Sequence, residues 1–488
     1  MNMTNLKGST INAVLWKLLE RGGSSIVQML VQIVMARLLA PEQFGALAVM
    51  LVFVNLGNVI VQSGLNTALI QSPKADDADF STVFWMSLAV SVVLYLIIFL
   101  AAPFVAGFYA MPEIVWPLRA LGLILIVNSY NAVQIAKVTR DLEMRKIFWA
   151  TMGSVTMSAG AGIFSAFAGA GLWALVAQQL AYQLVNCIVL AIQIDWKPRA
   201  IFKVERARVL FGFGWRLLVS GLLEQGYQSL ADLIVGKRFS AVQLGLVSQG
   251  KKYPQAVGMM LDGAIQPVML SAISRVQDDC MHVKCLVRRA LKTSTFLIFP
   301  AMTLFACCSP SLVPALLGPQ WAEAVPFMQI YCFTYALLPI HTTNLQALNG
   351  MGRSDLFLKL ELIKKGYGMA ALFICAFGFN DVFLLVASYL LTGVLSTFVN
   401  SYPNKRVIGY SYSEQIRDMA PAFLLSVCSA ACALLVGFVG MGDLTTVLLQ
   451  SIVFVVVYVG LSAITGLEEF EYLVLTAREV IGFRIKNK

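Results

Sequence analysis

The fold class follows from residues 147–194, which read IFWATMGSVTMSAGAGIFSAFAGAGLWALVAQQLAYQLVNCIVLAIQI and contain no charged side chain. A helix crosses the hydrocarbon core of a membrane in about 20 residues, so this run is too long for one span. The Ala-Gly-Ala-Gly sequence at Ala168–Gly171 predicts a tight turn inside it. The segment is therefore expected to form a hairpin of two membrane-spanning helices.

The composition of the whole chain agrees with a membrane protein. Of 488 residues, 58% are hydrophobic and 13% are charged, whereas soluble domains carry about 25% charged residues. Soluble and disordered classes are excluded, because the chain is also rich in aromatic residues. The net charge of +10 is interpreted as basic cytoplasmic loops rather than as a nucleic-acid surface.

Charge-free or nearly charge-free runs predict fourteen spans, so the chain is expected to be an all-α, polytopic transmembrane helical bundle. The span at Ile363–Phe379 is the shortest between charges, and its full crossing is left open. Besides the two spans of the hairpin, the twelve expected spans are Ile11–Ala36, Leu47–Ile70, Phe80–Pro112, Leu118–Ala136, Phe211–Val235, Val242–Ile273, Thr293–Ala322, Ala324–Gly352, Ile363–Phe379, Phe383–Pro403, Met419–Gly442 and Leu444–Leu467.

The basic residues predict the orientation of these spans. With fourteen spans, 27 of the 36 Lys and Arg residues fall in loops on one side, and four fall on the other. Because positive charge is retained in the cytoplasm, both termini are expected there. No external loop is long enough for a separate domain.

An internal repeat predicts two lobes. Trp16-Lys17-Leu18-Leu19 is echoed by Trp215-Arg216-Leu217-Leu218, and Gln43-Phe44-Gly45 by Gln243-Leu244-Gly245, at offsets of 199 and 200. Six spans per repeat give both copies the same orientation, as in two-lobed transporters. The expected domains are a six-helix lobe at 1–195, a cytoplasmic linker at 196–208, a second six-helix lobe at 209–403, and two C-terminal helices with a tail at 404–488.

Polar residues follow single faces of several expected helices, at spacings of three or four. Such amides form hydrogen bonds between helices, since each offers donors and acceptors. The main stripes are Lys17, Arg21, Ser24, Gln28 and Gln32; Asn55, Asn58, Gln62 and Asn66; Asn128, Asn131 and Gln134; Gln179, Gln183 and Asn186; and Glu224, Gln228 and Asp232.

Charged residues at membrane depth cost at least about 2.5–3.5 kcal/mol, so they usually face a partner or a watery cavity. They concentrate where the two repeats begin, and they are Lys17, Glu20, Arg21, Glu224, Asp232, Lys251, Lys252 and Asp262. The alternative is that the basic side chains extend to the membrane interface. No metal or cofactor is expected, because the nine Cys show no ligand spacing and only His282 and His341 are present.

Several motifs then carry a family resemblance. The sequence from Ala36 to Gly45, ARLLAPEQFG, resembles a segment of bacterial polysaccharide flippases, as do Ser63-Gly64-Leu65 and the stretch Asp79–Trp85. The chain resembles Wzx-type exporters of the multidrug/oligosaccharidyl-lipid/polysaccharide superfamily, especially their colanic-acid-exporter-like branch. The resemblance is densest over residues 10–150. It implies a flippase that moves undecaprenyl-pyrophosphate-linked oligosaccharide to the periplasmic leaflet by alternating access, for exopolysaccharide or surface-polysaccharide biosynthesis.

Residues and resemblance together predict a transporter with no catalytic group. Arginine and lysine suit a pyrophosphate. The expected substrate-binding residues are Arg21, Lys251, Lys252, Gln28, Asn58 and Gln62, and the expected charge-balancing or ion-coupling residues are Glu20, Glu224 and Asp232.

Lipid-linked oligosaccharide and membrane lipid are the expected partners, along with a polysaccharide polymerase and a chain-length regulator; nucleic acid is not. A multidrug or cation exporter of the same superfamily is the first alternative, and a membrane polysaccharide polymerase or ligase is the second. The sugar unit and the coupling ion stay open.

Overall fold

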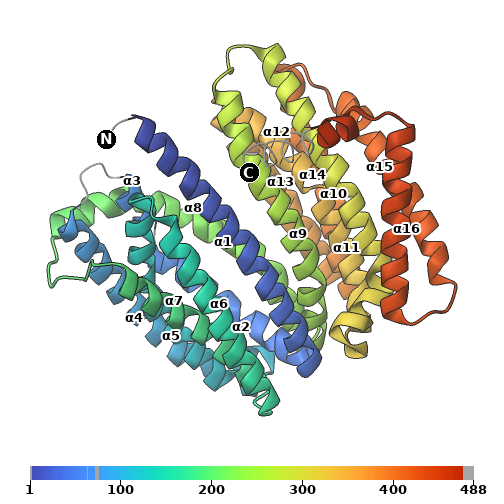
Figure 1. Cartoon of the computed structure of the whole chain (residues 1–488). Coiled ribbons are helices and arrows are strands. Elements are labelled where there is room, and N and C mark those ends of the chain that lie inside the picture. Colours follow the sequence, from blue (N-terminus) through green and yellow to red (C-terminus); the bar gives the residue numbers. More distant parts are fainter. Residues whose placement is uncertain (1–2, 63, 72–75, 476–488) are drawn as a thin grey trace, which may run out of the picture. The chain divides into compact units, whose positions relative to one another are not determined.

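A computed structural model describes residues 3–62, 64–71 and 76–475 of the chain. Within them every regular element is a helix and none is a strand (Figure 1). The all-α prediction is therefore confirmed. Predictions that concern Ser63, Lys74 and the basic tail from Arg478 to Lys488 lie outside the described residues.

Contacts divide the chain into two compact units, Met1–Ser248 and Gln249–Lys488. The first unit holds α1 (Met3–Leu38), α2 (Pro41–Gln62), α3 (Leu65–Gln71), α4 (Asp77–Tyr109), η1 (Pro112–Ile114), α5 (Val115–Arg140), α6 (Met144–Phe167), α7 (Leu172–Gln193), α8 (Val204–Arg238) and the start of α9 (Ala241–Ser274). The second holds the rest of α9, α10 (Cys280–Leu317), η2 (Pro319–Ala324), α11 (Val325–Ala336), α12 (Leu338–Gly350), α13 (Ser354–Gly378), α14 (Val382–Val407), α15 (Tyr412–Gly437) and α16 (Asp443–Ile464).

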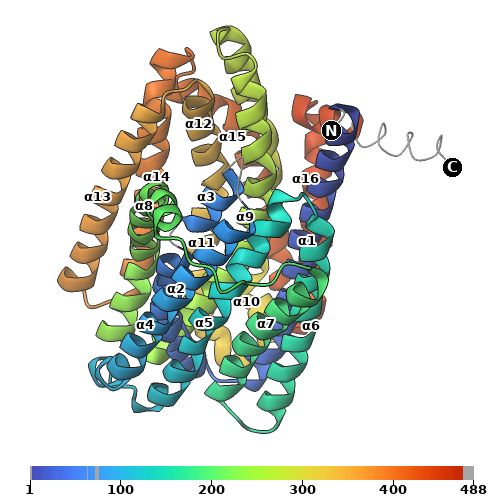
Figure 2. The ribbon, with the colours of Figure 1, turned by 90° about the vertical axis from the view of Figure 1, so that its left-hand side faces the viewer.

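In the first unit, α5 is the central helix and packs against α2, α4 and α7 (Figure 2). The antiparallel pair α6 and α7 packs on one side of it, and α1 lies along α6. A core of large apolar residues joins α3, α4, α5 and α7, including Leu69, Phe80, Val133, Leu190 and Trp196. This packing fixes the polar stripes of α5 and α7 relative to each other.

In the second unit, α10 is the central helix. It packs against α11, α12, α15 and α16, while α13 and α14 form a neighbouring pair. Ring contacts strengthen this packing, because Phe296 of α10 lies 5.3 Å from Tyr458 of α16, measured between ring centroids.

The hairpin predicted from residues 147–194 is confirmed. Helix α6 ends at Phe167 and α7 begins at Leu172. Gly169 and Gly171 have φ angles of 76° and 56° in the turn, a region that glycine adopts without the steric cost of a side chain.

Prolines in the second unit differ in their effect on the helices: one of them breaks an expected span, and others lie inside a continuous helix. The span expected at Ala324–Gly352 consists of two consecutive helices, α11 and α12, because Pro339 at the start of α12 lacks the N–H that would continue the helix. Helix α10, by contrast, continues through Pro310 and Pro314 to Leu317 and ends only at Gly318.

Nine helices of the described chain are long and apolar enough to cross a membrane, judged by length and composition: α2, α4, η1 with α5, α6, α7, α10, α14, α15 and α16. The protein is thus a multi-pass membrane protein. The remaining expected spans fall on α1, α8, α9, the broken pair α11–α12, and α13, which are more polar or interrupted. The total of fourteen stays a prediction.

The repeated Gln-x-Gly segments meet in the first unit. A Cβ built on Gly45 would lie 1.8 Å from the carbonyl oxygen of Ala241, and one built on Gly245 would lie 1.9 Å from the carbonyl oxygen of Pro41. The two contacts are equivalent under the repeat, because Gly45 corresponds to Gly245 and Pro41 to Ala241, each at an offset of 200. This reciprocal crossing of two helix starts supports the predicted repeat.

The compact units do not follow the expected lobe boundary at residues 195–209. Helix α8 packs against α2, α3 and α4, so the contact division falls after Ser248. The expected lobes were defined by a sequence repeat, whereas the two units are defined by packing contacts. The lobe limits therefore stay a prediction.

Candidate functional site

The charged end of the α1 stripe is only partly held by neighbours. Glu20 forms an ion pair with Lys17, with 2.5 Å between Nζ and Oε2, and it lies 3.5 Å from the Thr151 hydroxyl of α6, which donates to it. Arg21, one residue later, is exposed. Within the described chain, Glu20 is therefore the anchored charge and Arg21 the accessible one.

Further along the same face, Gln28 is exposed and Gln32 is buried. The face predicted from the spacing of these residues thus turns from accessible to buried along α1. Of the α1 residues predicted to bind substrate, Arg21 and Gln28 are both accessible.

The predicted amides of α2 have different surroundings. The Asn58 side-chain oxygen accepts a hydrogen bond from the Asn128 amide of α5 at 2.9 Å. Gln62, at the end of α2, is exposed. Asn58 therefore links two helices, whereas Gln62 has an accessible side chain.

Facing amides on α5 and α7 form a buried group. Asn131 donates to Gln183 at 3.5 Å. Gln134 lies one turn beyond Asn131 and Asn186 one turn beyond Gln183, and all of these except Gln183 are less than 9% exposed. We call Asn131, Gln134, Gln183 and Asn186 the amide cluster.

The amide cluster is incompletely hydrogen-bonded. Within the described residues, the side-chain oxygens of Asn131 and Asn186 and both polar atoms of Gln134 have no hydrogen-bond partner. An unsatisfied buried polar group costs about 1–3 kcal/mol. Water or a hydroxyl-rich ligand would remove this cost.

The predicted acids of α8 share a helix face. Gln228 donates to the Glu224 carboxylate at 2.7 Å, and Asp232 is half-buried one turn further on. Both acids make additional contacts. Helix α8 lies beside α2, since a Cβ on Gly221 would contact Val59.

Lys251 and Lys252 belong to the second unit, on α9. The side chain of Lys251 is half-buried, and that of Lys252 is exposed. Asp262, on the same helix, accepts a hydrogen bond from Thr342 of α12. Of these three charged residues, Asp262 is the one fixed to another helix.

The second unit holds a buried amide pair that the polar stripes did not predict. Asn344 of α12 and Gln415 of α15 exchange hydrogen bonds of 2.9 and 3.0 Å. Asn404 of α14 donates to the Asn344 side-chain oxygen at 2.6 Å. Three helices are joined by amides that use each other as partners.

A carboxylate next to this pair is equally well bound. Arg288 of α10 binds Asp418 of α15 in a fork, at 2.7 and 2.6 Å, and the Tyr410 hydroxyl donates to the same carboxylate at 2.7 Å. By sequence alone, Arg288 is one of several basic residues in a loop. The acid Asp418, which directly precedes an apolar run, is the sequence signal that could have predicted this ion pair.

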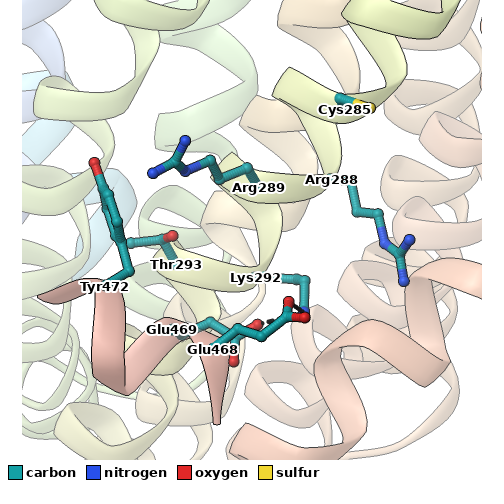
Figure 3. A pocket seen from close by; sticks show the side chains of 8 residues that line it. All are labelled: Cys285, Arg288, Arg289, Lys292, Thr293, Glu468, Glu469 and Tyr472. Atoms are coloured by element: carbon teal, nitrogen blue, oxygen red, sulfur yellow. Dashed lines mark hydrogen bonds and ion pairs between the residues drawn. The ribbon is translucent and has the colours of Figure 1, made fainter.

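The basic end of α10 also borders a cavity of about 440 Å³ (Figure 3). Lys292 pairs with Glu468 at 3.0 Å and Glu469 at 2.7 Å, and the Arg289 guanidinium lies 4.1 Å from the centre of the Tyr472 ring. Positive charge is balanced here, which does not favour an anion site. The lining residues are Cys285, Arg288, Arg289, Lys292, Thr293, Glu468, Glu469 and Tyr472.

Outside the spans, the linker is joined to the start of α4. Arg206 forms ion pairs with Asp76 and with Asp79, the latter at 3.0 Å. The hydrogen bond from Arg206 lowers the pKa of Asp76 to about 2.

No group of three or more His, Cys, Asp or Glu residues suited to a metal ion occurs within the described chain.

Comparison with known proteins defines the class. The chain has the fold of lipid II flippase MurJ in an inward closed conformation, with a TM-score of 0.75, 11% identity, and coverage of 92% of this chain and 99% of MurJ. It also matches an inward-facing MATE multidrug transporter of the MOP superfamily, with a TM-score of 0.62, 14% identity, and coverage of 80% and 98%. The protein thus has a polytopic transporter fold.

Sequence relatives narrow this class. Residues 34–326 match the family described as "Polysaccharide biosynthesis protein", and the chain belongs to that family. It is 25% identical to the succinoglycan biosynthesis transport protein ExoT of Rhizobium meliloti (strain 1021), over 74% of this chain and 73% of ExoT. It is 24% identical to the lipopolysaccharide biosynthesis protein WzxC of Escherichia coli (strain K12), over 90% of both chains. The resemblance drawn from Ala36–Gly45 is confirmed.

Proposed function

We propose that this protein is a flippase, not an enzyme, that moves an undecaprenyl-pyrophosphate-linked oligosaccharide from the cytoplasmic to the periplasmic leaflet of the bacterial inner membrane. Its family and its transporter fold support this function. The observation that carries the proposal is the amide cluster, which places unsatisfied hydrogen-bonding atoms inside an apolar multi-pass protein.

The sugar part of such a substrate suits neutral amides. Sugar hydroxyls donate and accept hydrogen bonds, as do the side chains of Asn and Gln. Accessible Gln28 and Gln62 would contact the sugars as they pass, together with Gln134. Asn58 would act through its hydrogen bond to Asn128, which holds the α2 stripe in place.

The pyrophosphate part suits cations. Arg21 and Lys252 have exposed side chains and Lys251 a half-buried one, although these residues lie in helices of an apolar protein. A pyrophosphate would compensate the cost of holding cations at membrane depth. Binding of such an anion in one conformation more strongly than in another would drive alternating access.

Three acids of the first unit are proposed to balance cations of that unit when no substrate is bound, or to take part in ion coupling. Glu20 already pairs with Lys17, and Glu224 shares the α8 face with Asp232. Protonation of one of these acids is one route to ion coupling. Both termini are proposed to be cytoplasmic, and a polymerase and a chain-length regulator are proposed to receive the product.

The test removes the two lysines together. With matched protein levels, the double variant Lys251→Gln/Lys252→Gln should accumulate lipid-linked oligosaccharide in the cytoplasmic leaflet and export less polymer, by about tenfold or more if two charge-assisted contacts are lost. Lys251→Arg keeps the charge and should export normally. Arg21→Lys should impair export, because lysine cannot replace the forked contact of arginine. Wild-type export by the double variant would contradict the proposed anion path.

A further inference from the structure

A second cavity, of about 420 Å³, lies in the first unit between α4, α5 and the end of α7. Its walls are mainly apolar and include Leu88, Ile126 and Ala191. Aromatic rings close one side, since Phe84 lies 5.6 Å from Tyr130 and Tyr130 lies 6.2 Å from Trp196, measured between centroids. None of the residues proposed for transport lines it.

The surface around this cavity is lipid-facing in character. Leu123 of α5 is 40% exposed, and Ile188 and Ile192 of α7 are 55% and 79% exposed. Large apolar side chains exposed on membrane helices contact acyl chains rather than water. The cavity is therefore available to a lipid chain.

One basic side chain stands at the rim. Lys197 lines the cavity four residues beyond the end of α7 and is exposed. Two other basic residues of this linker are used internally, because Arg199 pairs with Asp77 at 3.1 Å and Arg206 with Asp79. Within the described residues Lys197 has no acidic partner.

The linker that carries Lys197 is held in place by hydrogen bonds. The Trp85 indole donates to the Arg199 carbonyl at 2.8 Å, and the Arg199 amide donates to the Ser81 hydroxyl at 3.1 Å. The Lys203 amide donates to the Thr82 hydroxyl at 3.3 Å. Trp85 is 38% exposed, and partly exposed tryptophans concentrate at the membrane–water interface. These bonds hold the linker that carries Lys197 beside the apolar cavity, and the exposed Trp85 favours a place for it at headgroup level.

We propose that this cavity binds one acyl chain of an anionic membrane phospholipid, with the lipid phosphate on the ammonium group of Lys197. Basic pockets between membrane helices recognise anionic headgroups in this way. The apolar walls accept the chain, and Lys197, the basic residue that lines the cavity, selects the charge.

The experiment uses the purified full-length protein and a phosphatidylglycerol that carries a photoreactive diazirine in one acyl chain. A phosphatidylcholine with the same chains is the zwitterionic comparison. Cross-linked peptides are mapped by mass spectrometry. Phosphatidylglycerol should label the α5 and α7 peptides about fivefold more than phosphatidylcholine, the preference expected for one basic residue near a lipid surface.

Two variants and a control decide the outcome. Lys197→Gln should reduce labelling by phosphatidylglycerol to the phosphatidylcholine level, whereas Lys203→Gln, in the same linker, should not. Ala191→Phe should fill the cavity and remove labelling by both lipids, with an unchanged melting temperature as evidence of folding. Equal labelling by the two lipids in the wild type, or full preference in Lys197→Gln, would overturn the proposal. So would displacement by polyprenyl phosphate at lower concentration than by phosphatidylglycerol, since the occupant would then be a substrate lipid.

Discussion

Two buried glutamines show how differently the units use polar residues. Gln134 in the first unit and Gln415 in the second are both 0% exposed. Neither polar atom of Gln134 has a hydrogen-bond partner within the described residues, whereas Gln415 both donates to and accepts from Asn344. Burial and residue type are the same, so the neighbours decide what each side chain can do.

The same contrast extends to their surroundings. Gln415 lies near Asp418, whose carboxylate is bound by Arg288 and Tyr410. Gln134 belongs to a cluster of neutral amides with two further unsatisfied oxygens, whereas among Asn344, Asn404 and Gln415 only the Asn404 oxygen lacks a partner within the described residues. A polar group that has all its partners stabilises one structure, while one that lacks them is available to a ligand. We therefore propose that the amides around Gln415 stabilise the fold and that the amide cluster around Gln134 contacts the substrate.

The largest expected effect is on the bound carboxylate of the second unit. Arg288→Ala should lower the free energy of unfolding by about 3 kcal/mol, because it leaves a buried charge without its partner. The Asp418 side chain is 5% exposed, while Arg288 is half exposed, which limits the loss. Thermal unfolding followed by tryptophan fluorescence measures it. Arg417→Ala, an exposed neighbour of Asp418, is the control and should unfold as the wild type does.

The second prediction tests the two glutamines directly. Gln415→Leu should destabilise the protein by about 2 kcal/mol, since it removes the two buried hydrogen bonds between Gln415 and Asn344. Gln134→Leu should unfold at or above the wild-type temperature, because it removes an unsatisfied amide, yet it should reduce polymer export. If Gln134→Leu exports normally, or if it destabilises as much as Gln415→Leu, the amide cluster is a structural element.

A third prediction concerns the acids of α8. The double variant Glu224→Gln/Asp232→Asn should insert in the membrane at a normal level and export less polymer, because the charges that balance the proposed cations are gone. Polymer yield per amount of membrane protein measures this effect. Unchanged yield would show that the two carboxylates serve helix pairing alone.

The smallest effect is expected at the linker. The pKa of Asp76 is lowered to about 2 in the folded protein, so its ion pair contributes stability above pH 4 that is lost as the pH falls towards 2. The side chain is 53% exposed, so the contribution is at most about 1 kcal/mol. Asp76→Asn keeps an acceptor for the helix cap. It should make the free energy of unfolding less dependent on pH between pH 4 and 2. An unchanged dependence would show that other groups cause it.

Composition and periodicity determined the class of this protein. Long apolar runs leave a helix as the only stable backbone in a membrane, and the turn at Ala168–Gly171 followed from its glycines. Spacing along each helix also placed Asn131 and Gln134 on one face, and Gln183 and Asn186 on another, since the helical period fixes which residues share a face. The family resemblance of Ala36–Gly45 was also confirmed, because a motif is a property of the local sequence.

Only the tertiary structure decided which of those faces meet. It paired Asn58 with Asn128 and left Gln134 unsatisfied, and it joined Arg288 to Asp418 across 130 residues of sequence. It also carried α10 through Pro310, although proline lacks the backbone N–H of a regular helix. Hydrogen bonds and ion pairs between helices depend on packing between distant segments, and no local pattern records which segment will be the neighbour.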